Sequence, residues 1–235
     1  MTHSAPSEKV LVVDAGHGVG PLLAALLTDA GLEVSAWLTD VNAPPVDLPP
    51  AVRSLRVDAV EGLDADLIEA TDAVIFNSSA LDEEKLLADG ALADAVQADA
   101  RFFMATLQIF AKAMIEKGRG QIWVLGLDDS FAYYMPLPIT PIIQHARIGA
   151  VRALAKEIAR FGVSANAIIM QPAPEDAEPA AWQAARAGLA SYAQRFKPVT
   201  LAETVDTLAF WLRRKRLPMN GSVLHFGNGV YDGNA

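Results

Sequence analysis

The sequence predicts an α/β domain built on parallel strands. Two short aliphatic runs, Lys9–Val13 and Ile122–Leu125, have the composition of parallel strands that are buried on both faces. The first run is followed by a glycine-containing turn, and a helical segment begins at Pro21. A strand, a glycine-rich turn and a helix within ~30 residues form the first half of a β-α-β unit. The chain therefore begins as a parallel α/β protein does.

The later segments continue this alternation of strands and helices. Further strands are expected at 33–38, 52–57, 72–76 and 163–170, and helices at 21–30, 61–71, 83–117, 140–161, 175–197 and 201–214. Four prolines between 41 and 50 exclude a helix there, because proline breaks a helix interior. Neither an internal repeat nor a linker is evident. We therefore expect one domain over 1–235, with a flexible N-terminus at 1–8.

The composition restricts the class of protein. Of the 235 residues, 52% are hydrophobic and 20% are charged, which suits a globular chain with a sizeable core. The formal net charge of −9 argues against nucleic acid or an anionic membrane as partner, because both attract basic patches. The chain has no cysteine, a polar start and no apolar run long enough to cross a membrane. A cytoplasmic protein without a metal site is expected.

The stretch from Gln121 to Arg160 carries the most specific motifs. Its long helix contains Gly149-Ala150-Val151 and Leu154-Ala155-Lys156-Glu157, and a final strand region follows at 220–229 as Asn-Gly-Ser-Val-Leu-His-Phe-Gly-Asn-Gly. In these motifs the chain resembles the short-chain dehydrogenases/reductases, and the resemblance extends from Lys9 to Gly229. It implies a Rossmann-type doubly wound parallel sheet with helices on both faces.

The resemblance also locates the positions at which the family carries its catalytic Ser, Tyr, Lys and Asn. In this chain they are Leu127, Thr140, Gln144 and Asp99. In the family a phenol exchanges a proton with the substrate oxygen, and a neighbouring ammonium lowers the pKa of that phenol. Leu127 cannot hydrogen-bond a substrate, Thr140 has no accessible pKa and Gln144 is uncharged. No catalytic residue is therefore expected.

The cofactor positions of the family are altered as well. Its Thr-Gly-x-x-x-Gly-x-Gly turn reads Val13-Asp14-x-x-x-Gly18-x-Gly20, which puts a carboxylate where phosphates need N–H dipoles. Leu38 replaces the acid that holds the ribose diol at the end of the second strand. We expect neither NAD nor NADP to bind. The positions interpreted as vestigial are Asp14, Gly18, Gly20, Leu38, Asp58 and Asn77.

The helix expected at 83–117 has apolar residues over more than one face, whereas a single buried stripe needs only one. Its part at roughly 97–117 and the helix at 140–161 correspond to the helices on which the family builds its tetramers. An interface between subunits is therefore expected there. Its predicted residues are Phe102, Phe103, Leu107, Phe110, Ile148 and Arg152.

These losses favour a catalytically silent subunit that assembles with an active short-chain dehydrogenase, with a homo-oligomer as the other assembly. The family includes heteromeric enzymes with one silent subunit, such as the hydroxyacyl-CoA-type dehydrogenase of anaerobic toluene (benzylsuccinate) degradation. The alternative is an NAD(P)-dependent ketone/alcohol oxidoreductase with a rebuilt site that uses Ser130, Tyr133 or Asp99. A third hypothesis is a pseudoenzyme that senses a nucleotide or acyl-CoA through the remaining glycines, Asp58 and Asn77.

Overall fold

The strands predicted from the aliphatic runs pair in parallel to form one seven-stranded sheet. The computed structural model describes residues 8–78, 81–129, 140–171 and 199–227, together with 180, 183, 184 and 187. The strands are β1 Lys9–Val13, β2 Glu33–Leu38, β3 Arg53–Arg56, β4 Ala73–Phe76, β5 Gly120–Leu127, β6 Val163–Met170 and β7 Val223–Phe226. Their spatial order is β3-β2-β1-β4-β5-β6-β7, so the direction of winding reverses between β1 and β4.

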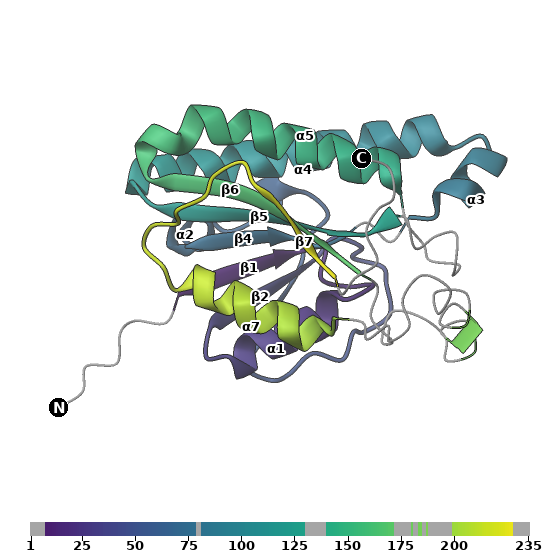
Figure 1. The fold of residues 1–235 in the computed structure, drawn as a ribbon, viewed down its shortest axis with the longest axis horizontal. Helices are drawn as coiled ribbons and strands as arrows, with labels where there is room; N and C mark the ends of the chain where they lie inside the picture. Colours follow the sequence, from purple (N-terminus) through teal and green to yellow (C-terminus); the bar gives the residue numbers. More distant parts are fainter. Residues whose placement is uncertain are drawn as a thin grey trace.

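Helices cover both faces of this sheet (Figure 1), which confirms the predicted α/β, doubly wound architecture. They are α1 Gly20–Asp29, α2 Ala65–Ala70, α3 Glu83–Ala88, α4 Leu92–Lys117, α5 Pro141–Ile158 and α7 Leu201–Leu212. In Figure 1, α1 and α7 lie on one side of the sheet and α4 and α5 on the other. Within the described residues, no helix combines the length and the apolar composition needed to cross a lipid bilayer.

The helix predicted at 83–117 is in fact two helices. The chain turns between α3 and α4 because Gly90 adopts a left-handed backbone conformation with φ of 68°, which ends α3. The helix predicted at 175–197 lies almost entirely outside the described residues, and so does the N-terminal segment 1–7. The break places α3 at the edge of the cleft described below.

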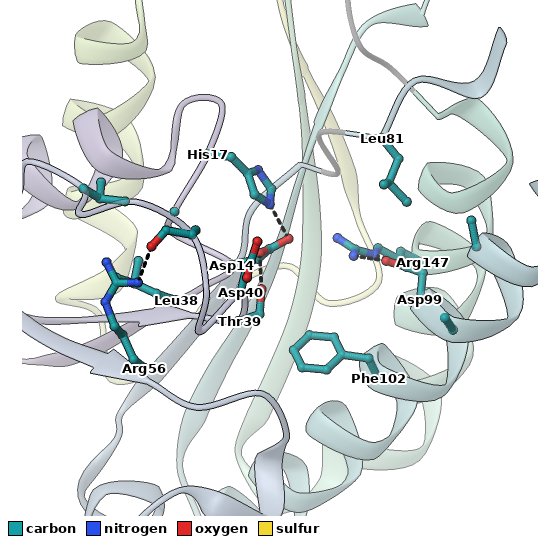
Figure 2. Close-up of a pocket in the computed structure, with 15 residues that line it drawn as sticks. Asp14, His17, Leu38, Thr39, Asp40, Arg56, Leu81, Asp99, Phe102 and Arg147 are labelled. Carbon is teal, nitrogen blue, oxygen red and sulfur yellow. Dashed lines mark hydrogen bonds and ion pairs between the residues drawn. The ribbon is translucent and has the colours of Figure 1, made fainter. Parts of the chain in front are cut away.

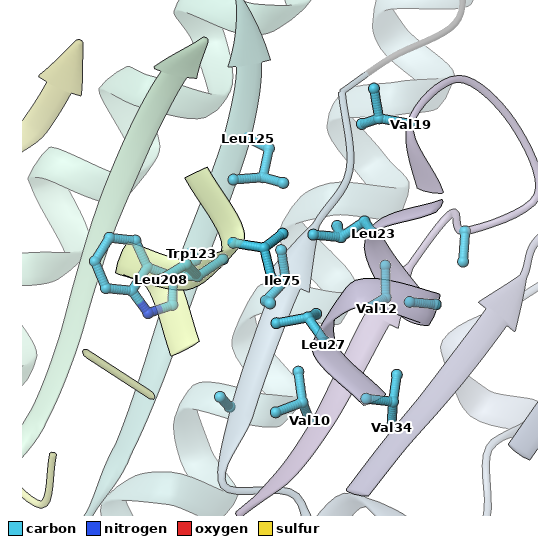
Figure 3. Close-up of a cluster of buried hydrophobic side chains, with 14 of the residues drawn as sticks. Val10, Val12, Val19, Leu23, Leu27, Val34, Ile75, Trp123, Leu125 and Leu208 are labelled. Atoms are coloured by element: carbon cyan, nitrogen blue, oxygen red, sulfur yellow. The ribbon is translucent and has the colours of Figure 1, made fainter. Parts of the chain in front are cut away.

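The core has two layers, because successive side chains of a strand point to opposite faces of the sheet. Val10 and Val12 of β1 pack with α1 and α7 in one layer, which Figure 3 shows. Leu11 and Val13 pack with α4 and α5 in the other layer. Each fully buried side chain of this kind contributes ~1.5–3 kcal/mol relative to an exposed one. The two layers hold the carboxyl ends of the strands at one edge of the sheet.

The structure corrects the expectation for the apolar surface of α4. Phe103, Leu107 and Phe110 are buried in the layer between the sheet and the helices, and Ile148 of α5 is buried with them. The prediction that these side chains face a partner is wrong. The physical reason is that α4 packs against the sheet, α2 and α5 together, so it buries a surface wider than one stripe.

Two of the predicted interface residues lie elsewhere. Phe102 is half-buried, and its ring centroid lies 5.3 Å from that of Trp37. Arg152 is exposed on α5. Among the large apolar side chains of α4, Met104 is exposed, at 51% of its full accessibility. The outward surfaces of α4 and α5 thus remain available, and an interface there stays a prediction.

The burial of Phe110 leads to a direct stability test. Phe110→Ala should lower the free energy of unfolding by about 3–5 kcal/mol, because it leaves a cavity in a packed layer. Gln108→Ala, at an exposed position of the same helix, should change it by less than about 0.5 kcal/mol. Urea denaturation followed by circular dichroism measures both values. A cost below about 1 kcal/mol for Phe110→Ala would mean that this side chain is not part of the core.

Candidate functional site

A cleft of about 560 Å³ opens at the carboxyl ends of the strands, where the strand order reverses between β1 and β4. Open parallel sheets bind ligands at such switch points. The lining comes from the turn after β1, the end of β2 and the loop after it, the end of β3, the residue Leu81 before α3, and α4 and α5. Figure 2 shows the side chains that converge on this space. This cleft is the candidate site.

Asn77, directly after β4, holds the turn that follows β1. Its side-chain amide donates to the carbonyl of Asp14 at 3.0 Å and to the carbonyl of His17 at 2.9 Å. Asn77 is completely buried, so these bonds are shielded from water. Asn77, which is interpreted from the sequence as a vestigial cofactor position, therefore fixes the backbone that a phosphate group would approach.

The glycines of the turn have distinct tasks. Gly18 adopts φ of 54°, which favours glycine. A Cβ on Gly20 would lie 2.7 Å from the carbonyl oxygen of Ala15, so the helix could not approach the turn with any other residue. Helix α1 begins at Gly20 with Pro21 in its first turn. The turn therefore keeps the close strand-to-helix geometry expected for it.

The carboxylate of Asp14 is paired. Nε2 of His17 lies 2.7 Å from its Oδ2, and the hydroxyl of Thr39 donates to its Oδ1 at 2.5 Å. Burial alone would raise the pKa of Asp14, but the hydrogen bond and charge of His17, the Thr39 hydroxyl and the charge of Arg147 together lower this pKa below its ordinary value of 3.8. Asp14 is thus ionised at neutral pH and compensated by its neighbours.

An ion pair between Asp99 of α4 and Arg147 of α5 closes one side of the cleft (Figure 2). Nε of Arg147 donates to Oδ2 of Asp99 at 3.1 Å, Nη2 donates to Oδ1, and Nη1 donates to the carbonyl of Asn77 at 2.9 Å. The guanidinium also lies over the ring of Phe103, 5.4 Å from its centroid. The two charged side chains are only 6% and 12% exposed. Each therefore requires the other, because an unpaired buried charge is costly.

The other positions that the family uses for catalysis come together in the structure. Leu127 and Thr140 are buried, and the Thr140 hydroxyl donates to the carbonyl of Leu81 at 2.6 Å. Leu127, Thr140 and Gln144 meet Arg147 around a space of about 10 Å³. That is roughly the room one water molecule needs. The described side chains around this space include no group that titrates near neutral pH.

Some predicted site residues are not part of the cleft. Asp58 is exposed and does not line it. Ser130 and Tyr133 of the rebuilt-site hypothesis lie outside the described residues. Asp99, the third candidate of that hypothesis, is committed to Arg147. Across the described residues, no group of three or more His, Asp or Glu side chains is placed to hold a metal ion.

Sequence reasoning did not identify Arg147, Thr39 or Arg56 as cleft residues. A signal for Arg147 was present, because it sits four residues from both Ile143 and Val151 in the buried stripe of α5. A charge inside an apolar stripe requires a partner on the facing helix. No comparable pattern marks Thr39 or Arg56, because their roles depend on how neighbouring strands pair.

Comparisons with known proteins agree with this fold. No family model and no curated protein sequence matches the chain. An oxidoreductase of the short-chain dehydrogenase/reductase family from Burkholderia thailandensis is similar in structure, with a TM-score of 0.65, 19% identity and coverage of 98% of this chain and 95% of that one. A short-chain dehydrogenase from Leptospira borgpetersenii with bound NAD+ matches with a TM-score of 0.65 and 15% identity, over 95% of this chain and 92% of that one. A variant of actinorhodin polyketide ketoreductase with NADPH matches with a TM-score of 0.62 and 19% identity, over 96% of this chain and 98% of that one. The chain therefore has the fold of the short-chain dehydrogenases/reductases.

The expectation that no cofactor binds is contradicted by these comparisons. Two of the similar structures, those from Leptospira and of the ketoreductase, carry NAD+ and NADPH. The expectation rested on Asp14 and Leu38. In the structure, His17 and Thr39 compensate the carboxylate of Asp14, and the side chain of Leu38 lines the cleft without closing it. Neither residue therefore excludes a dinucleotide.

The cleft residues fit such a group. The volume of about 560 Å³ lies within the range of about 300–1,000 Å³ typical of small-molecule sites. Asn77 and the glycines hold the turn at the start of α1, and helix N-termini favour phosphate groups. Leu38 and Val46 offer apolar surface at the other end of the cleft. Asp14 is the acid of the turn itself, and His17 balances its charge.

The buried ion pair can be tested by a double-mutant cycle. Asp99→Asn should cost about 3–5 kcal/mol of stability, because it leaves Arg147 buried without a counter-charge. Adding Arg147→Met should recover part of that loss, since the two changes are coupled by about 0.5–3 kcal/mol. Glu33→Gln, which removes an exposed ion pair with Lys9, is the control and should cost less than about 1 kcal/mol. If the stability losses of Asp99→Asn and Arg147→Met simply add in the double variant, the two side chains are not energetically paired.

Proposed function

We propose that this chain is a catalytically silent subunit with a short-chain dehydrogenase fold, which holds a nicotinamide dinucleotide and assembles with an active member of that family. The observation that supports it is the replacement of the whole proton-transfer set. Asp99 is tied to Arg147, while Leu127 and Thr140 are buried beside Gln144.

Reduction of a ketone needs a hydride and a proton, and a bound nicotinamide dinucleotide supplies the hydride. The proton must come from a positioned side chain with a suitable pKa. Thr140 donates its hydroxyl hydrogen to the carbonyl of Leu81. The amide of Gln144 can donate a hydrogen bond but is far too weak an acid to transfer a proton. Nε of Arg147 donates to Oδ2 of Asp99, so this carboxylate is occupied by the ion pair. These residues can shape and neutralise the cleft but cannot relay a proton.

The outward surfaces of α4 and α5 support the assembly part of the proposal. Met104 is an exposed apolar side chain on α4. Ala146, Gly149 and Ala153 are exposed on α5 at helical spacing, and a Cβ added to Gly149 would meet no atom within 4 Å. Small residues let a second helix approach closely. A partner with the same fold could pack its own α4 and α5 equivalents against this surface.

A second candidate function is an NAD(P)-dependent ketone/alcohol oxidoreductase with a different proton donor. One observation favours it. Nε2 of His145 lies 3.4 Å from Oδ2 of Asp129, just after β5. A histidine beside a carboxylate is a common acid–base pair. Both side chains are partly exposed, so a substrate could reach them.

Assembly can be tested by co-expression with an active short-chain dehydrogenase from a neighbouring gene. Size-exclusion chromatography with light scattering should show a stable complex. Gly149→Glu should disrupt it, because the new charge would lie in the helix contact while leaving the helix itself intact. Leu87→Glu on α3, where Leu87 is 67% exposed, is the matched control and should leave the complex unchanged. A monomer that binds no dehydrogenase would refute the subunit role.

A further inference from the structure

The end of β2 is paired with an arginine across the sheet. Leu38 is the last residue of β2, and its partner in the parallel register with β3 is Arg56. Paired residues of neighbouring strands point to the same face of a sheet. Both residues line the cleft, and Figure 2 shows them next to each other.

This position decides which dinucleotide a Rossmann-type site accepts. An acid at the end of the second strand accepts hydrogen bonds from the ribose hydroxyls of NAD, whereas a nearby arginine accommodates the 2′-phosphate of NADP. Leu38 has no acceptor for a ribose hydroxyl and is buried. Arg56 supplies a cation at the same place. The pair therefore has the composition of a site for the phosphorylated ribose.

The loop after β2 fixes the guanidinium of Arg56. Nη1 donates to the carbonyl of Ala43 at 3.0 Å, and Nη2 donates to the carbonyl of Pro44 at 3.3 Å. These bonds use two of the five N–H groups of an arginine, and the remaining ones can bind a phosphate oxygen. Arg56 is thus held in place before a ligand arrives, which lowers the entropy cost of binding.

The charge of Arg56 is not neutralised by the neighbouring acids. Within the described residues, no carboxylate lies at ion-pair distance from it. Asp40 also lines the cleft; its Oδ1 accepts the backbone N–H of Asn42 at 2.9 Å, and it makes no ion pair with Arg56. Asp14 is paired with His17. A phosphate beside Leu38 would therefore meet one positive charge with free donors.

We propose that the cleft selects NADP(H) over NAD(H), and that Arg56 is the residue that determines this specificity by binding the 2′-phosphate. The inference rests on the proposed function, which includes dinucleotide binding. It adds which of the two dinucleotides binds and which side chain distinguishes them.

Isothermal titration calorimetry on the full chain with NADP+ and with NAD+ tests this directly. The wild-type chain should bind NADP+ at least about tenfold more tightly, as charge-assisted bonds to a phosphate allow. Arg56→Gln should weaken NADP+ binding by about tenfold and leave NAD+ binding within about twofold, because it removes only the charge. Arg53→Gln, on the same strand but outside the cleft, is the matched control and should change neither affinity.

A second variant tests the specificity through a gain of NAD+ binding, so that the test does not depend only on weakened NADP+ binding. Leu38→Asp combined with Arg56→Gln supplies the ribose acceptor and removes the cation, so it should bind NAD+ more tightly than NADP+. Equal affinities in the wild type, or an Arg56→Gln variant that behaves like the wild type, would overturn the specificity while dinucleotide binding stands. Binding of neither dinucleotide would overturn this inference together with the dinucleotide part of the proposed function.

Discussion

The ion pair between Asp99 and Arg147 is the interaction on which the arrangement of the cleft depends. It joins α4 to α5, and the bond from Arg147 to the carbonyl of Asn77 ties both helices to the end of β4. Asn77 in turn holds the turn after β1. A single buried guanidinium therefore links the elements that surround the switch point of the sheet. Its cation–π contact with Phe103 extends this link into the core, where Phe103 packs edge-on against Phe76.

The two ends of the cleft differ in what they offer a ligand. At the end of β2, Leu38, Val46 and Arg56 leave an open surface with a fixed cation. At the end of β5, Leu127 and Thr140 surround a space with room for about one water molecule. Under the proposed function, the end of β2 would hold the nucleotide, while the described residues around the space at the end of β5 include no proton donor of the kind the family uses. The proposed absence of catalysis is compatible with ligand binding, because different residues line the two spaces.

The sequence predicted the strands and helices because their signals are local, whereas the doubly wound order of the sheet came from the family resemblance. Aliphatic runs such as Val10–Val13 and the glycine turn before Pro21 define a strand and a helix without knowledge of their neighbours. The surfaces of α4 could not be assigned in this way. Phe103 and Phe110 exceed what a single buried apolar stripe on α4 would require, yet both are buried because α4 also packs against α2 and α5. The compensation of Asp14 by Thr39 was also hidden, since those residues are 25 positions apart and meet only when β1 and β2 pair.

The central claim is that Leu127, Thr140 and Gln144 cannot deliver a proton. The most direct test follows the absorbance of NADPH during incubation of the isolated chain with simple ketones and 3-ketoacyl thioesters, from about pH 6 to pH 9, where catalytic acids and bases operate. The account predicts no oxidation of NADPH above that of a blank, at any pH in this range. Turnover with a bell-shaped pH profile that His145→Ala abolishes would contradict it and identify the chain as an enzyme with its own proton donor.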